Sequence, residues 1–140
     1  MANTPLSNLS DTDLLASMFE QMKALSDQEQ AVSFSDADLK ALGSDFLSWA
    51  RTCDTTGVRL RPALGDQGKT LGTYLLEVTG PDRPFLVDSL LGACTELSLD
   101  VRALFHPILG TDKETRRSLI QIHLPPLTEP EQVELKAEVE

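Results

Sequence analysis

The chain has 140 residues, of which 22 are acidic and 12 are basic, so its formal net charge is -10. This length fits one domain, or one domain with a helical extension, rather than a large enzyme. The negative charge would repel a phosphate backbone and no basic stripe interleaved with aromatic residues occurs, so we expect no nucleic-acid partner. No apolar run approaches about 20 residues and no signal sequence is visible, so we expect no membrane partner and a cytoplasmic location.

Two amphipathic helices are predicted in residues 1–56, which we treat as an N-terminal helical segment. The first begins near Ser10, and its apolar stripe consists of Leu14, Leu15, Met18, Met22 and Leu25. The second is the stronger prediction, because Phe34, Ser35 and Asp38 have the spacing of a hydrophobic staple, a helix cap and a capping-box partner. We expect the two helices to pack together or onto a sheet.

A β-hairpin is predicted after this segment, from residues 58–64 and 70–79. Arg59 alternates with apolar neighbours, as does Arg61, and we expect both arginines on the outer face of the hairpin. Pro62 lacks a backbone N–H and therefore suits an edge strand.

The remaining elements are predicted in the order helix, strand, strand, helix. Asp82 occupies the position of a cap for a helix that starts at Arg83, and strands are expected over residues 101–108 and 118–124. Ile120, Ile122 and Leu124 should face one side of the second of these strands. A capping box of Thr128 and Glu131 predicts the start of the last helix, and the given chain ends within that helix.

The segment 79–107 contains the candidate site, because the turn Gly80-Pro81 separates an apolar strand from a helix and directs backbone donors toward the space above it. The candidate effector or domain-interface residues are Asp82, Arg83, Phe85, Asp88, Ser89 and His106. Structural alternatives stay open: Asp82 is explained by a helix cap alone, and Asp88 by simple solvent exposure. No nucleophile, base and orienting group occur together, so no catalytic residue is predicted.

Metal and cofactor motifs are weak or missing in this sequence. His106 and His123 lack flanking carboxylates, so we predict no metal site. The cysteines Cys53 and Cys94 have no metal-ligand spacing and are predicted to be free thiols. No Gly-x-Gly-x-x-Gly sequence occurs, so we expect no dinucleotide cofactor in this fragment.

The predicted order of residues 57–140 is the split β-α-β pattern of ferredoxin-like domains without its last strand. This layout resembles the ACT domains, and Gly80-Pro81-Asp82-Arg83-Pro84 resembles the ACT turn, with Phe85 where that family usually has glycine. The fold class we predict is therefore α+β: a ferredoxin-like, ACT-like antiparallel sheet of four strands with helices on one face, preceded by two N-terminal helices. Residues 58–64 are the candidate to cover the sheet edge that the missing strand would leave.

Three further blocks of the sequence are informative: Asp82-Arg83-Pro84-Phe85-Leu86-Val87-Asp88-Ser89, Phe105-His106-Pro107 and Ser118-Leu119-Ile120-Gln121-Ile122. In order and spacing they resemble the N-terminal region of the large bacterial NAD-specific glutamate dehydrogenases. Arg117 departs from that family, which often has glutamate there.

This resemblance implies a regulatory or assembly domain, truncated in its last helix, of a parent enzyme that converts L-glutamate, NAD and water into 2-oxoglutarate, ammonia and NADH. Catalysis and NAD binding would lie beyond Glu140. The implied partners are the downstream domains of the same chain, further copies in a homo-oligomer and a small amino-acid effector. One alternative is a stand-alone ACT regulator that binds an amino acid. Another is the ACT tail of a signalling uridylyltransferase, although that tail follows its catalytic part.

Overall fold

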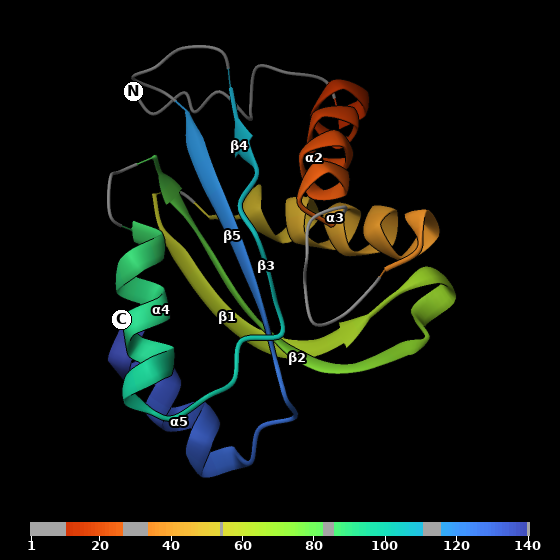
Figure 1. Cartoon of the computed structure of the whole chain (residues 1–140). Coiled ribbons are helices and arrows are strands. Elements are labelled where there is room, and N and C mark those ends of the chain that lie inside the picture. The colour runs from red at the N-terminus through yellow and green to blue at the C-terminus, as the bar shows by residue number, and fades with distance from the viewer. Residues whose placement is uncertain (1–10, 27–33, 54, 83–85, 111–115, 140) are drawn as a thin grey trace.

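The computed structural model describes residues 11–26, 34–53, 55–82, 86–110 and 116–139. Along the chain its elements are α2 (Asp11–Ser26), α3 (Asp36–Ala50), β1 (Gly57–Leu64), the 3-10 helix η1 (Asp66–Gly68), β2 (Thr70–Pro81), α4 (Leu86–Glu96), β3 (Ala103–Phe105), β4 (Ile108–Leu109), β5 (Arg117–Leu124) and α5 (Glu129–Val139) (Figure 1). The predicted α+β class and ferredoxin-like architecture are confirmed. The predicted division at residues 56 and 57 stays a prediction.

The sheet is antiparallel, with the strand order β1-β2-β5-β3, and β4 also pairs with β5. Phe105 lies opposite Gln121 and Ile108 lies opposite Ser118, so β3 and β4 share one register along β5. Pro107 lies between them and cannot donate a ladder hydrogen bond, although its carbonyl accepts one from Leu119 N at 2.9 Å. The strand predicted over residues 101–108 is therefore two short strands in one line.

Strand β1 fills the place that the last strand of the ferredoxin-like pattern would occupy. It pairs antiparallel with β2, with Val58 opposite Val78 and Arg61 opposite Leu75. The expected covering of this edge is thus confirmed. Because the covering strand precedes the split β-α-β unit in sequence, the sheet is a circularly permuted form of the usual order.

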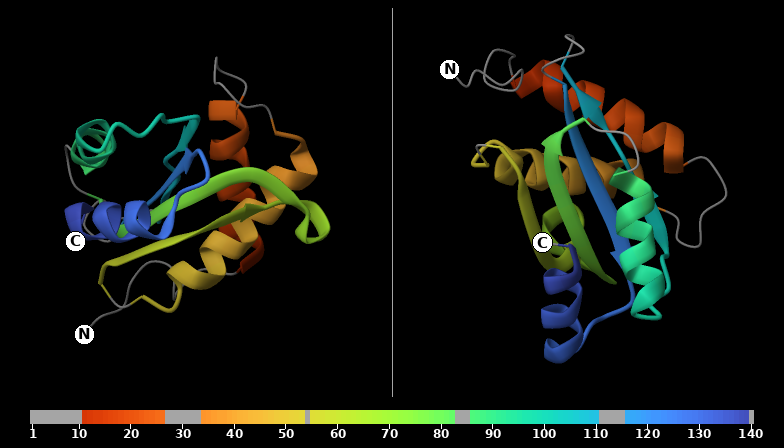
Figure 2. Two further views of the ribbon diagram at one scale, coloured as in Figure 1. Left: turned by 90° about the horizontal axis from the view of Figure 1, so that it is seen from below. Right: turned by 90° about the vertical axis from the view of Figure 1, so that its left-hand side faces the viewer.

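Each face of the sheet is covered by a pair of helices (Figure 2). Helices α4 and α5 pack on one face, where the buried cluster includes Leu76, Leu90, Ile120, Ile122, Leu124 and Leu135. Helices α2 and α3 cover the other, where the buried cluster includes Leu14, Met18, Met22, Leu42, Phe46, Leu75 and Leu119. The ACT-like helices thus share one face, as predicted, and the N-terminal pair packs onto the sheet. Full burial of each such side chain contributes about 1.5 to 3 kcal/mol.

Local caps fix two of the helix starts that the sequence predicts. Ser35 Oγ accepts a hydrogen bond from Asp38 N at 3.1 Å at the start of α3. The predicted capping box forms at α5, where Glu131 N donates to Thr128 Oγ1 at 3.3 Å and Thr128 N donates to Glu131 Oε1 at 2.9 Å. Within the described ranges, no helix has both the length and the apolar character needed to cross a membrane.

Candidate functional site

The prediction that Gly80 and Pro81 form the turn is wrong, because both still pair within β2, Gly80 opposite Ser118 and Pro81 opposite Arg117. The turn is therefore placed at Asp82, directly after β2, and Asp82 is tied to the start of β5. The Asp82 carboxylate accepts a hydrogen bond from Ser118 Oγ at 2.9 Å and pairs with Arg116 Nη2 at 3.3 Å. Asp82 N also donates to the Arg116 carbonyl at 3.1 Å. These contacts hold Asp82 against the start of β5.

His106 joins the same site from the link between β3 and β4. Its Nε2 lies 3.0 Å from Ser118 Oγ. Because the Ser118 hydroxyl donates its proton to Asp82, the network assigns Nε2–H of His106 as the donor to that hydroxyl oxygen. Desolvation lowers the pKa of His106, and the Asp82 charge opposes this in part. Asp82, Ser118 and His106 therefore form one hydrogen-bonded chain across three segments.

The other candidate residues do not join this chain within the described structure. Asp88 and Ser89 are exposed in the first half of α4. Arg83 and Phe85 lie outside the described residues, and Arg83 is where the helix that Asp82 was predicted to cap would start. The roles of Arg83 and Phe85 and the capping role of Asp82 stay predictions.

A pocket of about 460 Å³ lies beside the turn, at the paired ends of β1 and β2. Its walls are formed by Thr56, Gly57, Val58, Val78, Thr79, Gly80, Pro81, Leu86 and Val139. Gly80 is buried, and a methyl group on its Cα would lie 3.1 Å from Thr56 Cγ2. A larger residue at position 80 would therefore crowd the pocket wall.

A second polar centre, which the sequence reasoning missed, lies on the sheet face under α3. Glu77 is fully buried in β2 and accepts hydrogen bonds at Oε1 from Arg59 Nε at 2.6 Å and from Arg61 Nε at 2.8 Å. Its Oε2 accepts from Arg61 Nη2 at 3.2 Å and from Gln121 Nε2 at 2.7 Å. The prediction that Arg59 and Arg61 face outward is wrong, because the strand alternation directs both toward Glu77.

This polar centre continues to the rim of the sheet and is balanced in charge there. Asp45, on α3, pairs with Arg61 Nη1 at 2.7 Å and with Arg59 Nη2 at 3.4 Å. The Arg59 guanidinium also lies 4.7 Å from the ring centroid of Trp49. Two arginines therefore face two carboxylates, which leaves no net charge to attract an ionic ligand. A glutamate inside an otherwise apolar strand was the available sequence signal.

His123 extends the same centre along β5. Its Nε2 lies 2.8 Å from Gln121 Oε1, and its Nδ1 lies 3.3 Å from Thr73 Oγ1. Since Gln121 already donates its amide to Glu77, its oxygen requires Nε2–H on His123. Desolvation, reinforced by the Arg61 charge, lowers the pKa of His123 to about 3. This histidine is a neutral structural residue.

Arg117 is a buried cation at the start of β5, with 3% of its surface exposed. Its Nη2 donates to the Thr55 carbonyl at 2.9 Å and lies 3.4 Å from Thr79 Oγ1. Desolvation lowers its pKa, while the nearby Cys53 raises it. The predicted free thiols are confirmed at Cys53 and Cys94. In the part of the chain that the structure describes, no group of three or more metal-binding side chains occurs.

The geometry of the site suits positioning rather than covalent chemistry. Ser118 is fully buried and already bonded on both sides, so its hydroxyl is not presented to a substrate. Asp82 is engaged by Ser118 and Arg116 in the same way. The pocket beside the turn is open to solvent, and its walls combine apolar side chains with those of Thr56 and Thr79.

Comparison with known protein families gives a match over most of the chain. A family model described as "Glutamate dehydrogenase, ACT1 domain" matches residues 12–139. No curated protein and no solved structure gives a significant match. The matched range includes both helix pairs, the whole sheet and the turn at Asp82.

Proposed function

Since the chain belongs to the family of glutamate dehydrogenase ACT1 domains, we propose that it is a non-catalytic regulatory or assembly domain of an NAD-dependent glutamate dehydrogenase. The parent enzyme is an oxidoreductase of the glutamate dehydrogenase group. In this proposal it oxidises L-glutamate with NAD and water to 2-oxoglutarate, ammonia and NADH. The residues for NAD binding and catalysis belong to other parts of the parent.

The observation that carries this proposal is the family match over residues 12–139. It is supported by the state of the polar groups at the turn: Asp82, Ser118 and His106 satisfy one another, and Ser118 is buried. General acid–base or nucleophilic catalysis needs a group that can reach the substrate. A domain whose polar groups are satisfied internally is better suited to binding an effector or a neighbouring domain than to catalysis.

The proposed partners are the other domains of the parent chain, further copies of that chain in the cytoplasm and a small amino-acid effector. The pocket beside the turn supports the effector, because about 460 Å³ falls within the usual range for small-ligand sites. Thr56 and Thr79 are among the residues of its wall. An amino acid presents a carboxylate and an ammonium group, and a threonine hydroxyl can hydrogen-bond to either.

The enzymatic part of the proposal is tested with an antibody raised against the 140-residue chain. Protein captured from source cells is assayed for glutamate oxidation with NAD and, in parallel, with NADP. We expect activity with NAD and little with NADP, and no activity for the isolated chain. A preference for NADP would overturn the cofactor assignment, and activity of the isolated chain would overturn the non-catalytic role.

The effector is tested separately by thermal unfolding of the chain with each of the common amino acids. A ligand that binds only the folded state raises Tm in a concentration-dependent way. Val58→Phe fills the pocket and should abolish the shift, whereas Val133→Phe, on the exposed surface of α5, should leave it intact. An equal shift in both variants would place the ligand elsewhere.

A further inference from the structure

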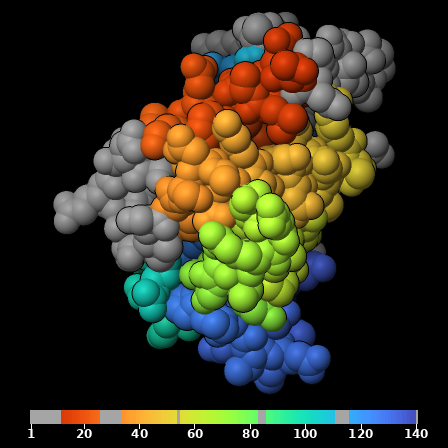
Figure 3. Space-filling model, turned by 90° about the vertical axis from the view of Figure 1, so that its right-hand side faces the viewer, coloured from red at the N-terminus to blue at the C-terminus, as the bar shows by residue number. Residues whose placement is uncertain are grey.

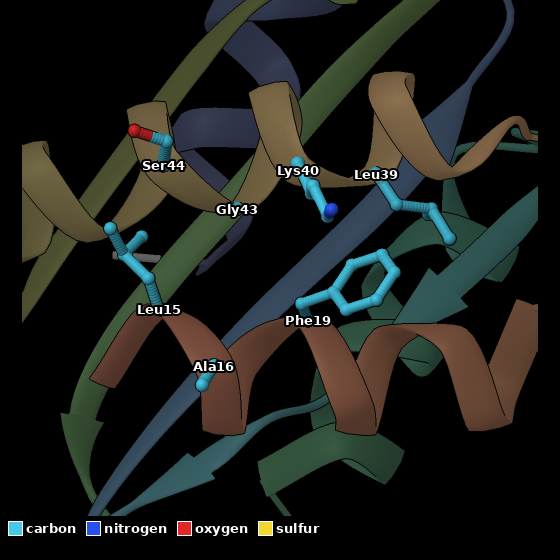
Figure 4. A pocket seen from close by; sticks show the side chains of 7 residues that line it. All are labelled: Leu15, Ala16, Phe19, Leu39, Lys40, Gly43 and Ser44. Atoms are coloured by element: carbon cyan, nitrogen blue, oxygen red, sulfur yellow. The ribbon is translucent and has the colours of Figure 1, made fainter. Parts of the chain in front are cut away.

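A second cavity, of about 430 Å³, opens between α2 and α3 (Figure 4). Figure 3 shows the two helices side by side on the molecular surface. The walls of this cleft are formed by Leu15, Ala16, Phe19, Leu39, Lys40, Gly43 and Ser44. Most of this lining is apolar, so the cleft offers hydrocarbon contact to whatever enters it.

The floor of the cleft depends on the absence of a side chain at Gly43. A Cβ at this position would lie 3.3 Å from Met22 Sδ, which is tighter than ordinary van der Waals contact. Gly43 thus lets α3 approach α2 closely and keeps this part of the wall flat. The shape of this part of the cleft therefore depends on glycine at position 43.

The cleft has one charged group at its rim. Of the seven described lining residues, Lys40 alone carries a charge, and its Nζ lies 5.0 Å from the ring centroid of Phe19. Figure 4 shows Lys40 reaching from α3 toward α2, with Phe19 and Leu15 reaching back. Within the described residues Lys40 forms no ion pair, so its positive charge is open to an incoming anion. This occurs in a chain whose net charge is -10.

From this combination we propose that the cleft binds an amphiphilic carboxylate: an unbranched alkyl chain that ends in a carboxylate group. The alkyl chain lies on Leu15, Ala16 and Phe19, which keep exposed surface, and the carboxylate pairs with the Lys40 ammonium. The volume of the cleft falls in the range of about 300 to 1,000 Å³ that small-ligand sites occupy. The proposal is independent of the function proposed for the turn.

The size of the cleft favours a small molecule over a docked protein. A stable protein interface uses about 20 to 30 residues on each side. The seven residues here fall far short of that number. A carboxylate is favoured over a cation because Lys40 is the group that would meet the polar end of the ligand.

The test is isothermal titration of the 140-residue chain with monomeric decanoate and with decyltrimethylammonium, which share an alkyl chain and differ in charge. We expect decanoate to bind at least about tenfold more tightly than the cation. Lys40→Glu should reverse that order, because the ligand meets the opposite charge. Ala16→Trp, at an exposed wall position, should weaken both ligands by about tenfold or more.

Lys136→Glu is the matched control, since it makes the same charge change on α5, across the sheet. Lys136→Glu should leave the preference for decanoate unchanged. In NMR spectra of the wild type, the resonance of the Gly43 amide should shift when decanoate binds. All three substituted residues are exposed, and unfolding temperatures check that each variant folds. Failure of decanoate to bind, or binding that neither Lys40→Glu nor Ala16→Trp changes, would overturn the proposal.

Discussion

Arg61 donates hydrogen bonds to both oxygens of the buried Glu77 carboxylate, from Nε to Oε1 at 2.8 Å and from Nη2 to Oε2 at 3.2 Å. Arg59 adds a third contact at 2.6 Å, and Gln121 adds a fourth at 2.7 Å. A buried carboxylate is tolerated only when it is paired and hydrogen-bonded in this way. The centre of the sheet therefore depends on β1, which supplies both arginines.

Glu77→Gln should destabilise the domain by about 3 kcal/mol, because it leaves two largely buried guanidinium groups without their internal carboxylate. Chemical denaturation measures the change in the free energy of unfolding. Asp45→Asn is the control: Asp45 contacts the same arginines, but 54% of its side chain is exposed, so the loss should stay within about 1 kcal/mol. Equal losses in both variants would contradict the central role of Glu77.

The His123 pKa predicts acid sensitivity. The pKa falls from its ordinary value of 6.5 to about 3 in the folded chain, so on acidification the unfolded state binds this proton first. The contribution of neutral His123 to the stability of the fold is therefore fully present above pH 6.5 and is lost as the pH falls toward 3. Wild type should lose stability relative to His123→Gln by about 1.4 kcal/mol per pH unit between about pH 6 and about pH 4. Parallel pH profiles would show that His123 titrates normally.

Asp38 should hold the tip of the β1–β2 hairpin against α3. Its carboxylate accepts a hydrogen bond from Asp66 N at 2.9 Å, which is the main cause of its lowered pKa, and Lys69 lies 3.3 Å away. Asp38→Ala should cost about 1 to 3 kcal/mol and speed hydrogen exchange at the Asp66 amide. Gly65→Ala should act similarly, because the added Cβ would collide with Asp38 Oδ1. Unchanged exchange at Asp66 in both variants would contradict this role.

The stabilisation that Asp38 provides also depends on pH. A carboxylate whose folded pKa is lowered stabilises the fold above its unfolded pKa, and that stabilisation is lost as the pH falls through the folded pKa. Asp38→Asn should therefore differ most from wild type near neutral pH. The difference should shrink in strong acid.

Gln21 should protect the edge of the sheet at β4. Its side-chain amide donates to the Ile108 carbonyl at 2.9 Å and accepts from Ile108 N at 2.7 Å, so it replaces a neighbouring strand. Gln21→Ala should cost about 2 kcal/mol and speed exchange at the Ile108 amide. Lys23 lies on the same helix as Gln21 and forms a partly exposed ion pair with Asp36 of α3, so Lys23→Ala should cost less than about 1 kcal/mol. Equal protection of Ile108 in both variants would refute the edge role.

Short-range signals in the sequence predicted the elements well. The cap at Ser35 and the box of Thr128 with Glu131 involve residues three apart, so local spacing is enough to identify them. The strand alternation of Ile120, Ile122 and Leu124 likewise places all three in one cluster. Pro107 marked the strand break, although the sequence analysis predicted one strand across it.

Contacts between residues far apart in the sequence could not be predicted from the sequence alone. Arg59 and Arg61 face inward because Glu77 lies on the same sheet face, and a shift of one residue in register would reverse that. At the site, Asp82 and His106 were both identified as candidates, but Ser118, which connects them, lies on a different strand. The cleft at Lys40 depends on how α2 crosses Gly43, and no local spacing reports that.

The most direct test of the proposed function is the size and activity of the native polypeptide that carries this chain. Source-cell lysate is fractionated by size, blotted with an antibody to the 140-residue chain and assayed across the same fractions for NAD-dependent glutamate oxidation. We predict a band much larger than 15.3 kDa that follows the activity. A band near 15.3 kDa, in fractions without that activity, would contradict the account and leave a separate small regulator.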